Sequence, residues 1–333
     1  MESPLGANLY NEIAIESYGC FTYKDDCEPG VRFMGSRPWL TYALVTLGFW
    51  GVWGAFTGLP ANHGFPETLI YCVWALMMIP PALYALRRVG WRLQRDPRSL
   101  LYGSLIGLLG AGGQMLLFHA VRIGPAYLIF PVISLSPLIT IVMSLAVLRE
   151  RTGKLGALGI ILALCSLPLF DYANGPDAGG MGQLWFLAAL GVLIAWGVQG
   201  FFMKLANTTM DAESIFFYMT VTGLLLMPVA ISMTDFSVPI NWGPDGPWLA
   251  AAIQILNSVG ALCLVYAFRY GKAIVVSPLT NAGAPLITAV ISILLLGAIP
   301  TGTKVAGIVL ALAAAVLLAI EPEPAAATAT APP

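Results

Sequence analysis

The chain has 333 residues and a net charge of −1; apolar residues make up 58% of it and charged residues only 10%. An ordinary soluble domain carries about 25% charged residues, so this composition excludes a soluble globular protein. Most apolar runs last about twenty residues, enough for a helix to cross a hydrocarbon core about 30 Å thick. We therefore expect an all-α integral membrane protein.

The N-terminal tail, residues 1–38, is polar and acidic and has no apolar block that would suit a signal peptide. We expect it to be disordered, with a short helix on the membrane surface as the alternative. Met34 stands directly before the first apolar run. Residues 1–33 are therefore either part of the natural protein or an over-extended start.

Ten apolar spans with short loops follow, at roughly 39–58, 65–86, 99–119, 124–148, 155–171, 183–204, 212–233, 247–267, 273–297 and 302–320. If the N-terminus is cytoplasmic, fourteen of the sixteen lysines and arginines fall on the cytoplasmic side, and only Arg122 and Lys304 fall outside. This partition follows the positive-inside rule and places both termini in the cytoplasm. The C-terminal tail, 321–333, is rich in Pro, Ala and Thr, and we expect it to be disordered.

The chain repeats itself: residues 119–159 resemble residues 266–307. Arg122 matches Arg269, and after one extra residue Pro137-Leu138-Ile139-Thr140 matches Pro285-Leu286-Ile287-Thr288. Each half holds five spans, an odd number, so the second half must cross the membrane in the opposite direction. The expected fold is ten transmembrane helices in two inverted five-helix repeats, residues 39–171 and 183–320, with a shared site where they meet.

The first spans of the two halves also correspond. Leu47-Gly48 with Trp53-Gly54 matches Leu190-Gly191 with Trp196-Gly197 at one constant offset. A turn of sequence GPA or GKA opens the fourth span of each half, and a glutamate, Glu150, follows the fourth span of the first half. In the second half, Gly297-Ala298 stands where the glutamate would be.

These motifs over residues 39–320 resemble the EamA-like drug/metabolite transporter superfamily. The resemblance implies a transporter built of two inverted halves but names no substrate. The family pattern has Gly-Glu after the fourth span of each half, whereas this chain has Arg149-Glu150 and then Gly297-Ala298. That departure argues against a symmetric role for the glutamate. With the short loops and the absence of targeting signals, the resemblance also implies the inner (plasma) membrane of a bacterium.

Polar side chains in mid-membrane are costly and should face a cavity or another helix. Gly110, Gly113 and Gln114 share one face of the third span, and Gln254, Asn257 and Ser258 share one face of the eighth. The two faces correspond in the repeat. We expect Gln114 and Asn257 to line the site, while the glycines allow close helix packing.

Aromatic residues give further candidates for substrate binding. Trp53 and Trp196 lie near the middle of their spans, where a ring can stack on a substrate or simply pack between helices, and Gln199 lies on the same side as Trp196. Tyr127 and Tyr218 are weaker candidates, with an interfacial or inter-helical hydrogen bond as the alternative.

Prolines occupy corresponding positions in the fourth and ninth spans. Pro131, Pro137, Pro278 and Pro285 interrupt the backbone hydrogen bonds there, and such kinks can act as gates. Asn281 lies between two of these prolines and joins the candidate binding residues.

No Asp or Glu falls deep within a predicted span, which argues against tight proton coupling. His119, near the outer end of its span, is expected to be interfacial. Lys204 is expected to extend to the lipid head groups; if it faces the cavity instead, it favours an anionic substrate. The chain offers no metal-ligand cluster, and we predict no metal and no cofactor.

The leading hypothesis is a secondary transporter that moves an amino acid, an aromatic metabolite or a small amphiphile across the plasma membrane by alternating access, in export or facilitated diffusion. We expect a small-molecule substrate, the bilayer and no nucleic acid as partners, and a monomer or homodimer. A membrane receptor or scaffold without transport is the alternative. An integral membrane enzyme acting on lipids would need paired acids or a His-rich cluster, which the spans lack.

Overall fold

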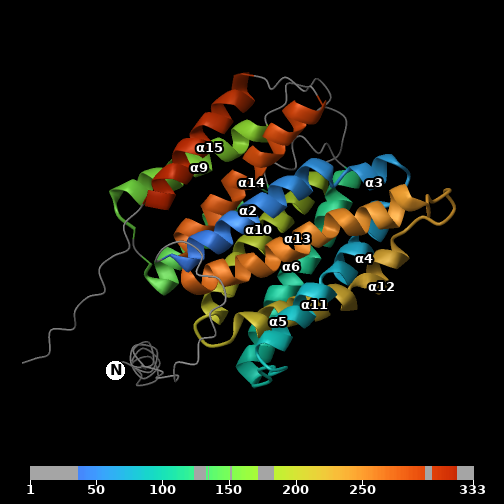
Figure 1. Ribbon diagram of the computed structural model, residues 1–333, viewed down its shortest axis with the longest axis horizontal. Coiled ribbons are helices and arrows are strands. Elements are labelled where there is room, and N and C mark those ends of the chain that lie inside the picture. The colour runs from blue at the N-terminus through green and yellow to red at the C-terminus, as the bar shows by residue number, and fades with distance from the viewer. Residues whose placement is uncertain are drawn as a thin grey trace, which may run out of the picture. The chain divides into compact units, whose positions relative to one another are not determined.

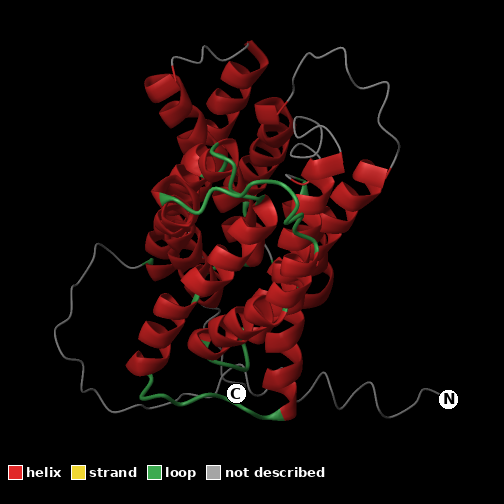
Figure 2. Cartoon of the chain, turned by 90° about the vertical axis from the view of Figure 1, so that its right-hand side faces the viewer, coloured by secondary structure: helices red, strands yellow, loops and turns green. Residues whose placement is uncertain are grey.

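The computed structural model describes residues 37–123, 133, 135–150, 152–171, 184–296 and 302–320, all within the unit that begins at Arg37. Every regular element in these ranges is a helix, and Figure 2 shows the helices in red and the described loops that join them in green. Nearly all of the predicted N-terminal tail and the whole C-terminal tail lie outside the described residues.

The predicted spans are found as helices, and their ends lie within a few residues of the expected ones, except that the predicted start of the fourth span at 124 lies outside the described residues. The first repeat contains α2 (Pro38–Phe56), α3 (Leu59–Asn62), α4 (Glu67–Met77), α5 (Ile79–Arg88), α6 (Pro97–Ile123), α8 (Ser136–Met143) with a π-helical turn (Ser144–Leu148), and α9 (Lys154–Asp171). The second contains α10 (Leu184–Ala206), α11 (Ala212–Leu225), α12 (Met227–Ser232), a π-helical turn (Pro244–Trp248), α13 (Leu249–Tyr270), α14 (Ala273–Leu296) and α15 (Gly302–Ile320). The all-helical fold class is confirmed.

Prolines divide one span of each repeat into two helices. Pro80 and Pro81 stand in the first turn of α5, directly after the end of α4. Pro228 stands in the first turn of α12, directly after the end of α11. Proline has no N–H to donate and fits the first turn of a helix without loss, so these prolines favour the start of a new helix. The second and seventh spans are therefore broken at matching places.

The prolines of the fourth and ninth spans behave differently from the expectation. Helix α14 continues past Pro278 and Pro285 without a break, and Pro137 occupies the first turn of α8. Pro131 lies outside the described residues. The predicted interruption of the ninth span is therefore not seen, and a gating role for these prolines stays a prediction.

The two repeats pack on each other reciprocally, as Figure 1 shows for α2 beside α13 and α14. Helix α2 of the first repeat packs on α13 and α14 of the second, and α10 of the second packs on α6 and α8 of the first. The second spans follow the same rule, since α4 packs on α13 and α11 on α6. The fifth spans, α9 and α15, pair with each other. Any site between the repeats is thus built from both.

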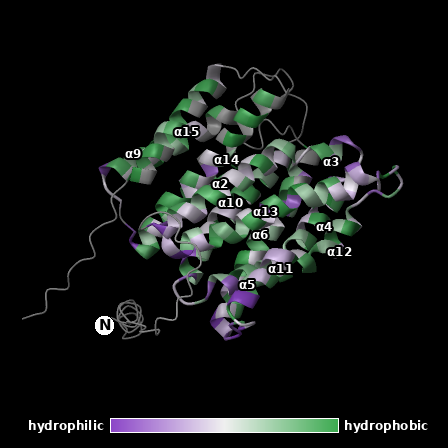
Figure 3. Ribbon diagram, in the orientation of Figure 1, coloured by the Kyte–Doolittle hydropathy of each residue, from purple (hydrophilic) through white to green (hydrophobic). Residues whose placement is uncertain are grey.

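Six helical segments of the described residues are long and apolar enough to cross a membrane: Pro38–Asn62, Glu67–Arg88, Pro97–Leu117, Leu184–Ala206, Ala212–Ser232 and Pro244–Tyr270. Three shorter apolar helices accompany them. In Figure 3 the helices are largely green, and hydrophilic purple gathers at the end of α5 and near α3.

The loops pair as an up-and-down order of spans requires. In the loop after α5, the Gln94 backbone N–H donates to Ser214 Oγ at 3.1 Å, and Gln94 Oε1 accepts from the Asp211 N–H at 2.6 Å. The loop after α5 and the loop before α11, which these bonds join, were both predicted on the cytoplasmic side. Among the loops predicted outside, Asn241 donates through its backbone N–H to the Gly64 carbonyl at 3.1 Å and through Nδ2 to the His63 carbonyl at 2.9 Å.

Candidate functional site

The first contact region between the repeats, here called the asparagine junction, consists of Trp50, Trp74 and Asn257. The Trp74 indole N–H donates to Asn257 Oδ1 at 2.8 Å, and the Trp50 N–H donates to the Asn257 carbonyl at 3.2 Å. Trp74 and Asn257 are each 8% exposed, so this polar contact is closed off from solvent and lipid. An indole N–H within a span must find an internal acceptor, and Asn257 supplies two.

One turn away, Gln254 is paired in the same manner. Its Oε1 accepts the Trp53 indole N–H at 3.0 Å, and its Nε2 lies 3.4 Å from Thr57 Oγ1. The polar face predicted on the eighth span is real, but the tryptophans and Thr57 of the first repeat occupy it. Trp53 and Asn257 were both predicted to bind substrate. In this structure each forms a hydrogen bond to the other repeat, Trp53 to Gln254 and Asn257 to Trp74.

The second contact region, here called the glutamine junction, consists of Gly110, Gln114, Trp196 and Gln199. The Trp196 N–H donates to the Gly110 carbonyl at 3.3 Å. The side chain of Gln199 lies directly over Gly110, where a Cβ would collide with Nε2. Gln114 is 8% exposed and shares the face of α6 that carries Gly110. Helix α6 belongs to the first repeat and α10 to the second.

The two junctions differ in how their amides are used. The side chains of Asn257 and Gln254 form hydrogen bonds with described side chains of the first repeat. The side chains of Gln114 and Gln199 form none with another described residue. These two amides, which other described side chains do not engage, are therefore the candidate ligand groups of the glutamine junction, beside the Trp196 ring.

The contacts correct one part of the predicted repeat. A Cβ on Gly113 would lie 2.5 Å from Trp196 Nε1, and a Cβ on Gly260 would lie 2.5 Å from Trp50 Cδ1. Trp50, and not Trp53, is thus the counterpart of Trp196. Gly51 and Gly197 agree with this, because each faces the isoleucine of the repeated Pro-Leu-Ile-Thr motif, Ile287 and Ile139 respectively.

The remaining predicted residues lie apart from both junctions. The hydroxyl of Tyr218 donates to the Gln94 carbonyl at 2.6 Å, which matches the inter-helical hydrogen bond considered as its alternative. Asn281 donates from Nδ2 to the Ser277 carbonyl of its own helix at 2.9 Å. Tyr127 lies outside the described residues. His119 is exposed near the end of α6.

Comparison with known proteins decides the family. The model of the EamA-like transporter family matches this chain twice, over residues 37–170 and 183–320. The chain belongs to the EamA-like transporter family. It is a multi-pass membrane protein with two EamA domains, and the resemblance seen in the sequence is confirmed.

Individual relatives of this EamA-like protein are distant. It is 26% identical over 262 residues to Protein RarD of Streptomyces exfoliatus, covering 74% of this chain and 75% of the relative. It is 32% identical over 79 residues to an uncharacterized protein of Methanocaldococcus jannaschii, covering 24% of this chain and 58% of the relative. A solved crystal structure that is 18% identical shares the fold with a TM-score of 0.68, covering 84% of this chain and 98% of the other.

Two charged residues of this EamA-like protein meet at the loop between α13 and α14. Lys204 Nζ donates to the carbonyls of Phe268 at 3.0 Å and Gly271 at 2.5 Å. The expectation that Lys204 reaches the lipid head groups is therefore wrong. Lys204 instead donates hydrogen bonds to backbone carbonyls at the end of α13 that have no partner within the helix. Glu150 accepts the backbone N–H groups of Ala273 and Ile274, both at 3.1 Å, and so caps α14.

The sequence analysis missed Trp50, Trp74 and Gln254 as partners across the repeats. Trp74 carried a usable signal, because it stands in the middle of an apolar span and its N–H needs an acceptor there. Which acceptor it finds depends on the packing of α4 against α13, and that is visible only in the structure.

Proposed function

We propose that this protein is a secondary transporter that carries a small aromatic or amphiphilic metabolite, such as an amino acid, by alternating access between its two repeats. The proposal rests on the side-chain amides of Gln114 and Gln199 beside Trp196, which form no hydrogen bond to another described side chain. They lie on helices of different repeats, α6 and α10, which pack on each other. A movement of one repeat against the other would open or close this region.

The chemistry of the glutamine junction suits a polar but uncharged ligand group next to a ring or apolar body. Two amides provide both donors and acceptors, and the Trp196 ring provides an apolar or cation-binding face. The described acids and bases stand at helix ends and in loops, so they lie near the ends of the spans rather than beside Gln114. Export or facilitated diffusion without tight proton coupling fits this arrangement best.

The orientation that we propose has both termini in the cytoplasm of a bacterial cell, in the plasma membrane. It is supported by the fourteen basic residues on that side against two on the other. The two repeats would then extend over residues 39–171 and 183–320, and the protein acts as a monomer or homodimer.

The test is a thermal-shift screen of the detergent-purified full chain against amino acids, nucleosides, sugars and polyamines, followed by uptake of each stabilising compound into proteoliposomes. A ligand at a hundred times its dissociation constant adds about 2.7 kcal/mol of stability. Gln114→Leu and Gln199→Leu should each weaken binding by about 2- to 13-fold, the value of one lost neutral hydrogen bond. Ser104→Ala, an exposed change on α6, is the matched control.

A ligand whose binding is unaffected by both glutamine variants would refute the site. If a ligand binds to the glutamine junction but is never transported into proteoliposomes, the result would favour a receptor over a transporter.

A further inference from the structure

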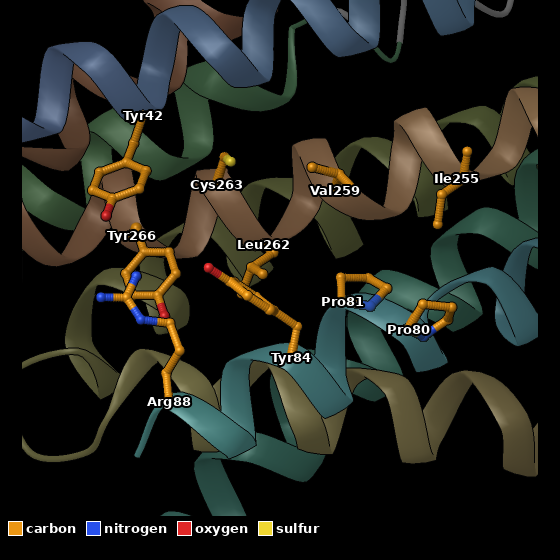
Figure 4. Close-up of a pocket in the computed structure, with 10 residues that line it drawn as sticks. All are labelled: Tyr42, Pro80, Pro81, Tyr84, Arg88, Ile255, Val259, Leu262, Cys263 and Tyr266. Atoms are coloured by element: carbon orange, nitrogen blue, oxygen red, sulfur yellow. The ribbon is translucent and has the colours of Figure 1, made fainter. Parts of the chain in front are cut away.

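A groove on another face of the protein has no part in the proposed transport site. It is a cavity of about 440 Å³ between α2, α5 and α13, shown in Figure 4. This volume lies within the range of about 300–1,000 Å³ usual for ligand sites. Its α13 wall includes Ile255, Val259 and Tyr266. At about 100° per residue these lie on a different face of α13 from Gln254 and Asn257.

The lining changes from apolar to polar along the groove. Pro80, Pro81 and Ile255 form one end, Tyr42, Arg88 and Tyr266 form the other, and Tyr84 lies between them. From Ile255 to Tyr266 the helix rises about 16 Å, which is close to half of a hydrocarbon core about 30 Å thick. The groove therefore has the depth of one leaflet, with its polar end toward the membrane surface.

Arg88, at the polar end, is followed in the chain by a segment rich in arginine that also contains Asp96. Arg88 is exposed and ends α5, and the next eleven positions include Arg92, Arg95 and Arg98, which are also exposed. Glu213 accepts a hydrogen bond from the hydroxyl of the lining residue Tyr266 at 2.6 Å. Arg88 forms no ion pair with a described residue. Clusters of basic residues beside a span attract anionic lipid head groups.

We propose that this groove binds an anionic phospholipid, with its phosphate at Arg88 and one acyl chain along the apolar wall of α13. A soluble anion has no apolar part that could be buried against the apolar wall of the groove, whereas an acyl chain would fill it. Tyr84 is 62% exposed, so the groove is open on its outer side and the second acyl chain stays in the bilayer. The bound lipid touches α2 and α5 of one repeat and α13 of the other, and so bridges the two repeats.

The test uses the delipidated full chain in detergent, titrated with phosphatidylglycerol, with phosphatidylcholine of the same chains, and with glycerol 3-phosphate. Phosphatidylglycerol should raise the melting temperature, and the other two should not. Arg88→Gln should weaken the response about tenfold or more, as expected for a lost charged hydrogen bond. Val259→Trp, which fills the groove, should weaken it as well.

Arg87→Gln is the matched control, because Arg87 is a neighbouring arginine that is also exposed and does not line the groove. Melting of each variant without lipid reports whether it is folded. The proposal is overturned by an equal response to phosphatidylcholine, by a response to glycerol 3-phosphate, by equal losses in the two arginine variants, or by an unchanged response in Val259→Trp. Phosphatidylglycerol specificity that requires Arg88 and an open groove supports it.

Discussion

The hydrogen bond between Trp74 and Asn257 allows a sharp test of what holds the two repeats together. In Asn257→Leu the buried Trp74 N–H loses its 2.8 Å acceptor. A buried donor without a partner costs about 1–3 kcal/mol, while hydrogen bonds between membrane helices average about 0.6 kcal/mol and reach about 1.7 kcal/mol in double-mutant cycles. We therefore expect Asn257→Leu to lower the free energy of unfolding by about 1–2 kcal/mol.

The pairwise contribution is isolated by combining Asn257→Leu with Trp74→Phe. Unfolding in mixed micelles of rising dodecyl sulfate content, followed by helical circular dichroism, gives the free energy of each variant. The two changes should be non-additive by about 0.6–1.7 kcal/mol.

A second cycle, Asn257→Leu with Trp50→Phe, is the control. Trp50 donates to the backbone carbonyl of Asn257, which the substitution leaves in place. This cycle should be additive within about 0.3–0.5 kcal/mol. Equal coupling in both cycles, or none in the first, would refute the assignment of the bond to the Asn257 side chain.

Two further substitutions test the close contacts between the repeats in the same unfolding assay. Glu150→Gln removes the charge and one acceptor from the cap of α14 and should cost about 1–2 kcal/mol, the value of a partly buried charge at a helix N-terminus; an unchanged free energy of unfolding would contradict the cap. Gly113→Ala places a Cβ against Trp196 and should cost about 1–3 kcal/mol, whereas Gly112→Ala, with nothing within 4 Å of its Cβ, should be neutral or slightly stabilising. Equal effects of the two alanines would show that close packing at Gly113 is not needed.

The spans could be predicted from the sequence because the thickness of the bilayer fixes their length and apolar character. The pairing of the tryptophans could not. Trp50-Gly51 and Trp53-Gly54 are identical motifs three residues apart, hence on nearly the same helix face, and a constant offset to Trp196 does not distinguish them. The contact of Gly51 with Ile287 does, because it is a property of helix packing and not of either helix alone.

The contacts of charged residues near the ends of the spans were equally hard to predict from the sequence. Lys204 stands near the end of a span, where its long side chain can reach either the head groups or a neighbouring helix end. The free carbonyls at the end of α13 decide the outcome, and they come near only when the second repeat packs on itself. The helix breaks at Pro80 and Pro228 follow the ordinary effect of proline in mid-span, but α14 is unbroken at Pro278 and Pro285, so proline alone did not predict where a span divides.

The reciprocal packing of the repeats has a consequence for the order in which the protein is made. The partner of the Trp50 N–H lies 207 residues later in the chain. At about 5–20 residues per second, α13 follows α2 after about 10–40 seconds of synthesis. Throughout that interval α2 and α4 are within reach of lipid but their indole N–H groups lack the acceptor that Asn257 provides. The hydrogen bonds of Trp50 and Trp74 in the first repeat can therefore form only after α13 of the second repeat has entered the membrane.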